Sequence, residues 1–153
     1  MRNWWGWLAL SAAVIVLDQL TKQWVSQSLA FGEVMPVAPF FNLVLAHNAG
    51  AAFSFLAGAG GWQRGFFIGI AVVAAAVIVH LLRKHRGEKL FSLALALILG
   101  GALGNLIDRI LLGHVVDFLD FYVQNYHWPA FNVADMAITG GAGLLIWDSI
   151  KKP

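Results

Sequence analysis

The chain has 153 residues, of which 59% are hydrophobic and only 12% are charged, whereas a typical soluble domain carries about 25% charged residues. This composition excludes an ordinary soluble domain and indicates one integral membrane domain over residues 1–153. The chain has no cysteine, which excludes disulfides, a thiol nucleophile and cysteine-ligated metal centres, and its net charge of +2 is too small to indicate a nucleic-acid partner.

Four segments are long and apolar enough to cross a bilayer, which takes about 20 mostly apolar residues. They are residues 4–24, 66–82, 90–110 and 133–150, with boundaries accurate to a few residues. The sequence therefore predicts an all-α membrane protein with four transmembrane helices. A cleaved signal peptide is the alternative for the first segment, but its apolar run continues into Asp18 and Lys22 without a clear cleavage site, which favours a retained helix.

The basic residues at the segment ends predict the orientation. They are Arg2 before the first segment, Arg83, Lys84, Arg86 and Lys89 between the second and third, and Lys151 and Lys152 after the fourth. By the positive-inside rule, both termini and the connection over residues 83–89 are cytoplasmic. The connections over residues 25–65 and 111–132 then face outward.

The first outer connection contains a β-prone segment, Pro39–Leu45, and a turn signal at Asn48-Ala49-Gly50 before Ala51–Phe55. We expect a small sheet or hairpin here, and the alternative is an irregular loop resting on the bilayer. The last two apolar segments are rich in glycine, which lets helices approach closely in lipid. These glycines are Gly100, Gly101, Gly104, Gly140, Gly141 and Gly143.

Polar residues of three apolar segments gather at one depth. In the predicted orientation they lie near the outer boundary: Asp18, Lys22, Asn105, Asp108, Arg109, Asn132 and Asp135. Asp117 follows the third segment within a few residues, whereas the inner halves are nearly free of such groups. Ionisable groups beside hydrocarbon are costly, so this cluster indicates a functional site.

Several members of the cluster also have structural explanations. Asp18 and Lys22 are four residues apart and can form an ion pair, or Lys22 can reach the headgroups. Asn132 can cap the fourth helix, whose first turn favours the charge of Asp135. Asn105 can hydrogen-bond to a neighbouring helix.

Three further polar residues receive separate interpretations. We interpret Asp108 as a membrane-border residue and Asp120 as a solvated loop acid. The planar guanidinium of Arg109 suits a backbone carbonyl or a carboxylate.

The known motifs for other chemistries are absent. There is no His-Glu-x-x-His helix, no Gly-x-Ser-x-Gly elbow and no phosphate-binding loop. The histidines, at positions 47, 80, 85, 114 and 127, are scattered in sequence. We therefore predict no metal and no cofactor.

Asp117 and Asp135 can perform acid–base chemistry if they lie face to face. Neighbouring carboxyl groups do not both ionise easily, so one retains a proton while the other stays charged. The charged acid can take a proton from water, and the neutral acid can donate one to a carbonyl oxygen or a leaving nitrogen. This chemistry needs neither a covalent intermediate nor a metal.

The sequence resembles the bacterial lipoprotein signal peptidase (signal peptidase II) family in five ordered blocks. The blocks are Leu17–Lys22, His47–Ser54, Gly100–Arg109, Gly113–Phe118 and Phe131–Asp135. The resemblance implies a single integral membrane peptidase domain of four transmembrane helices with a small β-rich extracytoplasmic cradle. It also implies a location in the bacterial inner membrane, with the active site near the periplasmic face.

The resemblance further implies an aspartic endopeptidase that removes the signal peptide from diacylglyceryl-modified prolipoproteins, cutting just before the lipidated cysteine. Asp117 and Asp135 match the catalytic pair of the family. The positions that shape or line the site are Asp18, Lys22, Asn48, Asn105, Arg109 and Asn132. Membrane lipids and the cyclic peptide antibiotic globomycin, an inhibitor, are the other implied partners.

Two other functions are alternatives. A small proton-coupled transporter subunit would also use acids within the membrane, but it would need polar residues at several depths. A non-enzymatic assembly partner would explain the glycines and leave the paired aspartates unexplained. We expect a monomer.

Overall fold

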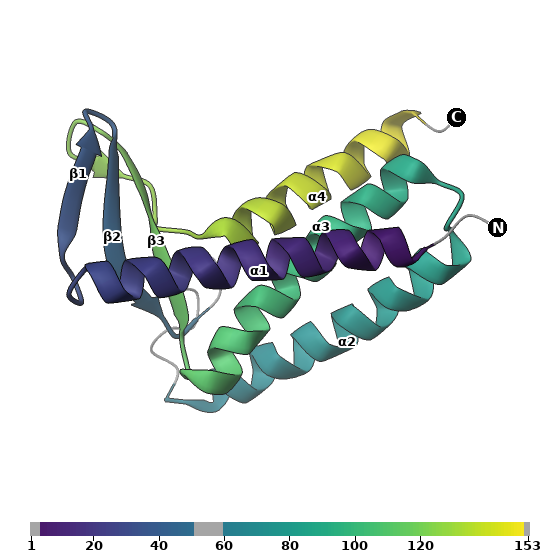
Figure 1. The fold of residues 1–153 in the computed structure, drawn as a ribbon, viewed down its shortest axis with the longest axis horizontal. Helices are drawn as coiled ribbons and strands as arrows, with labels where there is room; N and C mark the ends of the chain where they lie inside the picture. The colour runs from purple at the N-terminus through teal and green to yellow at the C-terminus, as the bar shows by residue number, and fades with distance from the viewer. Residues whose placement is uncertain (1–3, 51–59, 152–153) are drawn as a thin grey trace.

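The computed structural model describes residues 4–50 and 60–151. Its four helices are α1 (Trp5–Ser28), α2 (Trp62–Lys84), α3 (Lys89–Leu111) and α4 (Val133–Lys151). The strands β1 (Val34–Ala38), β2 (Phe41–Asn48), β3 (Val115–Val123) and β4 (Tyr126–His127) form one antiparallel sheet in the order β1-β2-β3-β4. The sheet lies at one end of the helices (Figure 1), and the fold is thus mostly helical with a small sheet.

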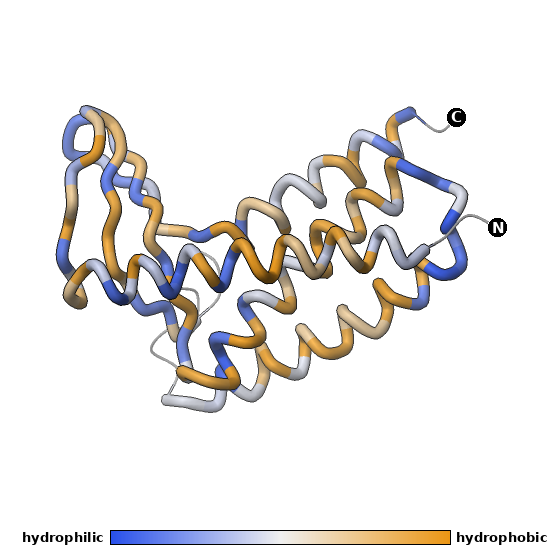
Figure 2. The backbone as a smooth tube through the Cα atoms, in the orientation of Figure 1, coloured by the Kyte–Doolittle hydropathy of each residue, from blue (hydrophilic) through white to orange (hydrophobic). Residues whose placement is uncertain are grey.

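The predicted helices lie where the hydropathy pattern put them, with boundaries shifted by at most a few residues. Among the described residues, three helices are long and apolar enough to cross a membrane: α2, α3 and α4. Helix α1 does not meet the same measure, and its second half contains Asp18 and Lys22. Figure 2 shows hydrophobic residues along the helices and hydrophilic ones at the α2–α3 connection and where the helices meet the sheet.

Helix α3 lies at the centre of the fold, and the other three helices pack against it. Small residues permit two of these contacts. A Cβ atom on Gly100 would lie 2.8 Å from the Ser11 carbonyl oxygen of α1, and one on Gly141 would lie 2.7 Å from the Ala94 carbonyl oxygen. Leu95 and Leu99 pack against Ile78 and Leu82 of α2.

The expected role of the glycines is therefore confirmed only in part. Gly100, Gly101, Gly104 and Gly141 stand at close helix contacts, whereas a Cβ atom on Gly140 or Gly143 would meet no atom within 4 Å. The last two glycines point away from the packed faces of α4.

The sheet confirms the β-prone outer segment and extends beyond it. Strand β2 begins at Phe41 and ends at Asn48, where the predicted turn begins; the Gly50 amide donates to Asn48 Oδ1 at 2.9 Å. The expected continuation at Ala51–Phe55, as well as Arg2 and Lys152, lies outside the described residues. Strand β3 was not anticipated, and it is the strand that carries Asp117.

The connection from α3 to β3 and on to α4 holds together the ends of these elements that lie near the sheet. Gly113 has a positive φ of 82°, a backbone conformation that glycine adopts without strain, at the reversal between α3 and β3. The Phe131 amide donates to the Leu119 carbonyl oxygen, and the Leu119 amide donates back to Phe131. Asn132 and the first turn of α4 are thereby held beside β3.

Substituting Gly101 tests the close approach of α3 and α4. A Cβ atom on this residue would overlap the Ala134 carbonyl oxygen, so Gly101→Ala should destabilise the fold by about 1–3 kcal/mol through overpacking. The measurement is the thermal unfolding midpoint in detergent. Gly143→Ala is the matched control: its midpoint should stay equal or rise, because alanine favours a helix more than glycine does. Equal midpoints for the two variants would contradict this packing.

Candidate active site

The ammonium group of Lys22 lies at the centre of a buried polar network. Lys22 Nζ is 2.7 Å from Asp18 Oδ2 and 2.9 Å from Asp108 Oδ2, and it donates to Asn105 Oδ1 at 2.9 Å. An ammonium group has three donors, so this arrangement satisfies it completely. The predicted ion pair with Asp18 is confirmed. The alternative that Lys22 reaches the headgroups is wrong, because its side chain is only 4% exposed.

Asp108 is a buried partner in this network and not a border residue, which corrects our interpretation. Its carboxylate forms an ion pair with Lys22. It also accepts hydrogen bonds from the side-chain amide of Gln19 at 2.8 Å and from the backbone amide of Val116 at 3.1 Å. The participation of Gln19 in this network was not predicted from the sequence. Gln19 also donates to the Gly104 carbonyl oxygen, so it joins α1 to α3 through two hydrogen bonds.

Asp18 connects α1 to the start of α4. Its Oδ1 atom accepts the backbone amide of Ala134 at 2.9 Å, while Oδ2 faces Lys22. A Cβ atom on Gly104 would lie 2.6 Å from Asp18 Oδ2, so only glycine leaves room for this carboxylate. The side chain of Asp18 thus satisfies one of the free N–H groups at the start of α4.

Asn132 is the N-cap residue of α4, as its position in the sequence predicts. Its Oδ1 atom accepts the backbone amide of Asp135 at 2.9 Å. Its Nδ2 group donates to Asp117 Oδ1 at 2.7 Å and to Asn105 Oδ1 at 3.2 Å. Asn132 therefore contacts both predicted catalytic aspartates, one through its side-chain nitrogen and the other through its oxygen.

Asparagine amides hold the two predicted catalytic carboxylates. Asp117 also accepts a hydrogen bond from Asn48 Nδ2 at 3.2 Å, and Asp135 Oδ1 accepts one from Asn105 Nδ2 at 2.8 Å. Asn48 pairs with Val115 in the sheet, so it is the diagonal neighbour of Asp117 on the same face. The structure thus brings Asp117 and Asp135 into one network.

The pKa of Asp117 is raised to about 7 from its ordinary value of 3.8. Burial is the main cause, since this residue is only 4% exposed, and the negative charge of Asp135 adds to it. The hydrogen bonds from Asn48 and Asn132 and the charge of Lys22 act in the opposite direction. A carboxyl group of this kind can both hold and release a proton at neutral pH.

Arg109 binds a backbone carbonyl, as the sequence predicts. Its Nη2 group donates to the Gly50 carbonyl oxygen at 2.9 Å, and its guanidinium lies 5.2 Å from the ring centre of Phe67 on α2. Its buried Nε group has no hydrogen-bond partner among the described residues. All eight residues predicted to form or shape the site are therefore joined to one another or lie at its edge.

Asp120 is not a solvated loop acid, which corrects a second interpretation. It is buried in β3, accepts a hydrogen bond from Asn42 Nδ2 at 2.8 Å and lies 2.9 Å from His127 Nδ1. Asp117 and Asp120 are three residues apart in one strand, so they point to opposite faces of the sheet. Asp120 therefore belongs to a separate structural cluster.

Two of the histidines that are distant in sequence meet in the structure. The rings of His47 and His114 stack with their centres 3.9 Å apart, and the ring of Phe31 is tilted against that of His47 with the centres 4.7 Å apart. Burial, and next the nearby His47, lower the pKa of His114. Over residues 4–50 and 60–151, no three histidine, aspartate or glutamate side chains are arranged to hold a metal ion.

Comparison with known proteins identifies the family. The family model described as "Signal peptidase (SPase) II" matches residues 10–151. The chain is 63% identical to a protein of Ralstonia nicotianae named lipoprotein signal peptidase, over 95% of this chain and 84% of that protein. It is 61% identical to a protein of the same name from Cupriavidus necator, over 95% of this chain and 83% of that protein.

Two solved structures, each described as a bacterial membrane enzyme, have the same fold. One superposes with a TM-score of 0.87 at 33% sequence identity, covering 95% of this chain and 88% of the other. The second has a TM-score of 0.85 at 33% identity, covering 97% of this chain and 94% of the other. The comparisons give no support to the alternatives of a transporter subunit or an assembly partner.

Removing the ammonium group of Lys22 tests the network. Lys22→Ala leaves the carboxylates of Asp18 and Asp108 buried without their cation, which should cost about 3–5 kcal/mol of stability. The measurement is the thermal unfolding midpoint in detergent. Lys89→Ala, at the exposed start of α3, is the control and should change the midpoint little. A Lys22→Ala variant as stable as this control would show that the network is incidental.

The raised pKa of Asp117 predicts a pH dependence of stability. The folded state holds this proton up to about pH 7, whereas the unfolded chain releases it near pH 3.8. The free energy of unfolding should therefore fall as pH rises between these values, by at most about 1.4 kcal/mol per pH unit from this group. Asp117→Asn should lack this contribution. Unfolding midpoints at pH 5 and pH 8 measure it, and parallel pH profiles for the two proteins would contradict it.

Proposed function

This chain belongs to the signal peptidase II family, and we propose that it cleaves prolipoproteins as an aspartic peptidase with Asp117 and Asp135 as the catalytic pair. It is a lipoprotein signal peptidase by its similarity over nearly the whole chain. The proposal concerns the catalytic type, the residues, the topology and the form of the substrate.

The observation that carries the proposal is the shared hydrogen-bond network of the two carboxyl groups. Asn132 donates to Asp117, Asn105 donates to Asp135, and Asn132 also donates to Asn105. Both acids are thus held by neutral amides, and the charge of Asp135 raises the pKa of Asp117. Two acids with different proton affinities suit general acid–base catalysis.

In the proposed reaction, one ionised aspartate takes a proton from a water molecule while the oxygen of that water attacks the scissile carbonyl carbon. The protonated aspartate donates its proton to the carbonyl oxygen, which gives a tetrahedral diol. When the diol collapses, the carbon–nitrogen bond breaks and the leaving nitrogen takes a proton from the acid that accepted the first one. A hydroxyl of the diol at the same time returns a proton to the other aspartate, which restores the starting protonation of the pair. A new carboxylic acid and a new amine result, and proton transfers of this kind each contribute typically about 10²–10⁴-fold in rate.

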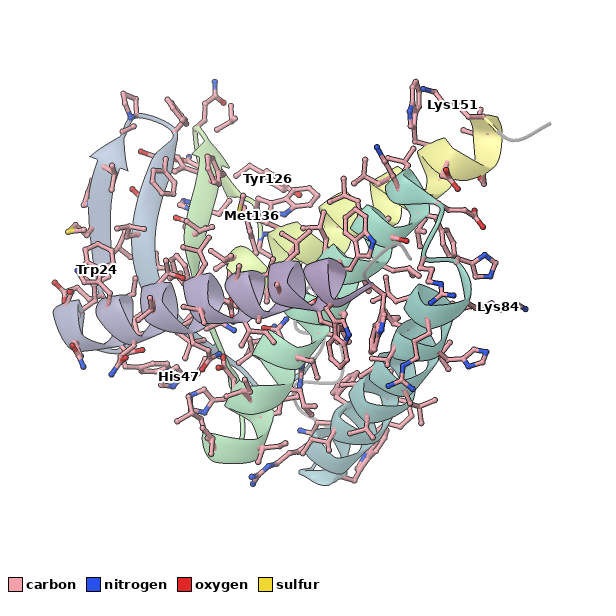
Figure 3. All side chains as sticks on the ribbon, turned by 45° about the vertical axis from the view of Figure 1, so that its right-hand side comes forward. Trp24, His47, Lys84, Tyr126, Met136 and Lys151 are labelled. Carbon is pink, nitrogen blue, oxygen red and sulfur yellow. The ribbon has the colours of Figure 1, made fainter. Side chains whose placement is uncertain are left out.

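We further propose that α1 is the fourth transmembrane helix and that the site faces the periplasm of a bacterial inner membrane. Lys84 and Lys151 lie at the end of the helices remote from the sheet (Figure 3), which supports a cytoplasmic position for this end and for both termini. Helix α1 has 24 residues and exposes Val16, Leu17 and Leu20. Its polar residues Asp18 and Lys22 are turned toward α3, so the outward side of α1 suits lipid.

The proposed substrate is a prolipoprotein whose cysteine carries diacylglycerol, cut just before that cysteine. A lipid-anchored cysteine would hold its neighbouring peptide bond at the depth of the polar network. The outer sheet could bind an extended peptide, and Arg109 and Asn48 are the polar groups at the edge of the site. We expect lipids as further partners, globomycin as an inhibitor, and a monomeric enzyme without a cofactor.

Conservative substitution of either aspartate tests the proposed mechanism. Asp117→Asn and Asp135→Asn are nearly isosteric, yet each removes one proton-transferring group, so cleavage should fall at least about 10²-fold. The assay is cleavage of a diacylglyceryl prolipoprotein by the purified protein in detergent.

Asp148→Asn, at the opposite end of α4 from Asp135, is the matched control and should retain full cleavage. All variants must show a cooperative thermal unfolding transition, so that lost activity is not lost structure. Chelators should leave cleavage unchanged. Normal cleavage by either Asn variant, or an activity lost to chelators and restored by zinc, would rule out the mechanism.

A further inference from the structure

An apolar groove runs between α1 and α2, on a different side of α3 from the catalytic network. Its volume is about 410 Å³, and its lining includes Leu8, Ala12 and Ile15 of α1, Ala75 and Val79 of α2, and Leu99 of α3. Helices α1 and α2 both pack on α3, so α3 forms the floor of the groove. The site residues Asn105 and Arg109 are not among the residues that line it.

The groove is open along one side and offers no free polar group. Ala12 and Ala76 line it and are nevertheless exposed, so its mouth faces the surroundings of the helices. Ser11 is the polar residue in the lining, and its hydroxyl donates a hydrogen bond to the Ala96 carbonyl oxygen at 2.8 Å. Its ligand must therefore be apolar along the length of the groove.

A cationic side chain stands at one end of the groove. Val79 and Arg83 are four residues apart and lie on one face of α2, so Arg83 continues the stripe that lines the groove. The Arg83 guanidinium lies 4.7 Å from the ring centre of Trp4, which precedes α1. This contact joins the ends of the two helices.

Arg83 remains available to an anion. It is exposed, and within the described residues no carboxylate forms an ion pair with it. Lys84 and Arg86 follow directly and are also exposed. An apolar groove that ends at exposed basic residues matches a phospholipid, which joins an acyl chain to an anionic headgroup, because basic pockets between membrane helices bind such headgroups.

We propose that the α1–α2 groove binds an anionic glycerophospholipid, with one acyl chain along Leu8, Ala12 and Val79 and the phosphate at Arg83. This site is separate from peptide cleavage, and it rests on the proposed membrane insertion of α1. The groove is a site for a lipid and not for the scissile peptide, because it is remote from Asp117 and Asp135. Its bound lipid would fill the space that α1 and α2 leave above α3.

Native mass spectrometry of the purified protein tests the site, with phosphatidylglycerol and phosphatidylcholine of identical acyl chains as probes. The wild-type protein should retain phosphatidylglycerol about fivefold better, the preference expected from one basic residue at a membrane surface. Arg83→Gln should abolish this preference. Ala12→Phe and Ala76→Phe, which each place a ring in the groove, should lower retention of both lipids about tenfold.

Two matched controls separate the groove from the general surface. Val73→Phe adds a ring to an exposed position of α2 outside the groove and should leave lipid retention unchanged. Lys151→Gln removes a cation that also lies over a tryptophan ring, at 4.7 Å from the ring centre of Trp147, and neither residue is among those that line the groove. The preference for phosphatidylglycerol should survive this change.

Three results would overturn the proposal. The first is equal retention of the two lipids by the wild-type protein. The second is unchanged retention when both Ala12→Phe and Ala76→Phe keep the wild-type unfolding midpoint. The third is a wild-type dimer that Ala12→Phe separates, which would assign the groove to a helix of a second copy. The experiment measures lipid retention and not cleavage. Failure of the catalytic proposal would therefore leave the lipid site intact, and failure of the lipid site would leave the catalytic proposal intact.

Discussion

The buried ammonium group of Lys22 is the interaction on which the other features of the site depend. A charge in a low-dielectric interior is tolerated only when it is paired and fully hydrogen-bonded, and Lys22 meets this condition with Asp18, Asp108 and Asn105. Each of these partners also forms a hydrogen bond to another element. Asp18 binds the first turn of α4, Asp108 binds the start of β3, and Asn105 binds Asp135. One cation therefore fixes the relative positions of the elements that carry the two aspartates.

Helix α3 can contact both α1 and α4 because different residues lie on the two faces that it turns toward these helices. Gly100, Gly104 and Asp108 recur every four residues and face α1, where small residues leave room for the carboxylate of Asp18. Gly101 and Asn105 form the stripe that faces α4. The polar network therefore depends on the close packing, because the hydrogen bonds between the helices need backbones that approach as closely as glycine allows.

The hydropathy pattern was enough to predict the helices, and the depth of the polar residues was enough to group the candidate site residues that lie on or next to the helices, but not to predict all of their roles. Asp108 lies four residues after Gly104, so the stripe toward α1 could have revealed its burial. Asp120 could not be recognised, because its partners Asn42 and His127 come from strands whose register no local pattern specifies. Asn48 could be named only through the family resemblance, because it reaches Asp117 through the pairing of β2 with β3.

Within the described residues, the side chains that hydrogen-bond to the carboxyl groups of Asp117 and Asp135 are amides, and this has a chemical consequence. A guanidinium or ammonium group in direct contact would hold a carboxylate ionised and lower its pKa well below neutrality. Asn48 and Asn132 orient Asp117 without imposing a full charge, and the charge of Lys22, which hydrogen-bonds to Asn105, lowers the pKa of Asp117 less than burial raises it. The pKa of Asp117 can therefore stay near 7, where one carboxyl group can hold a proton while its neighbour accepts another.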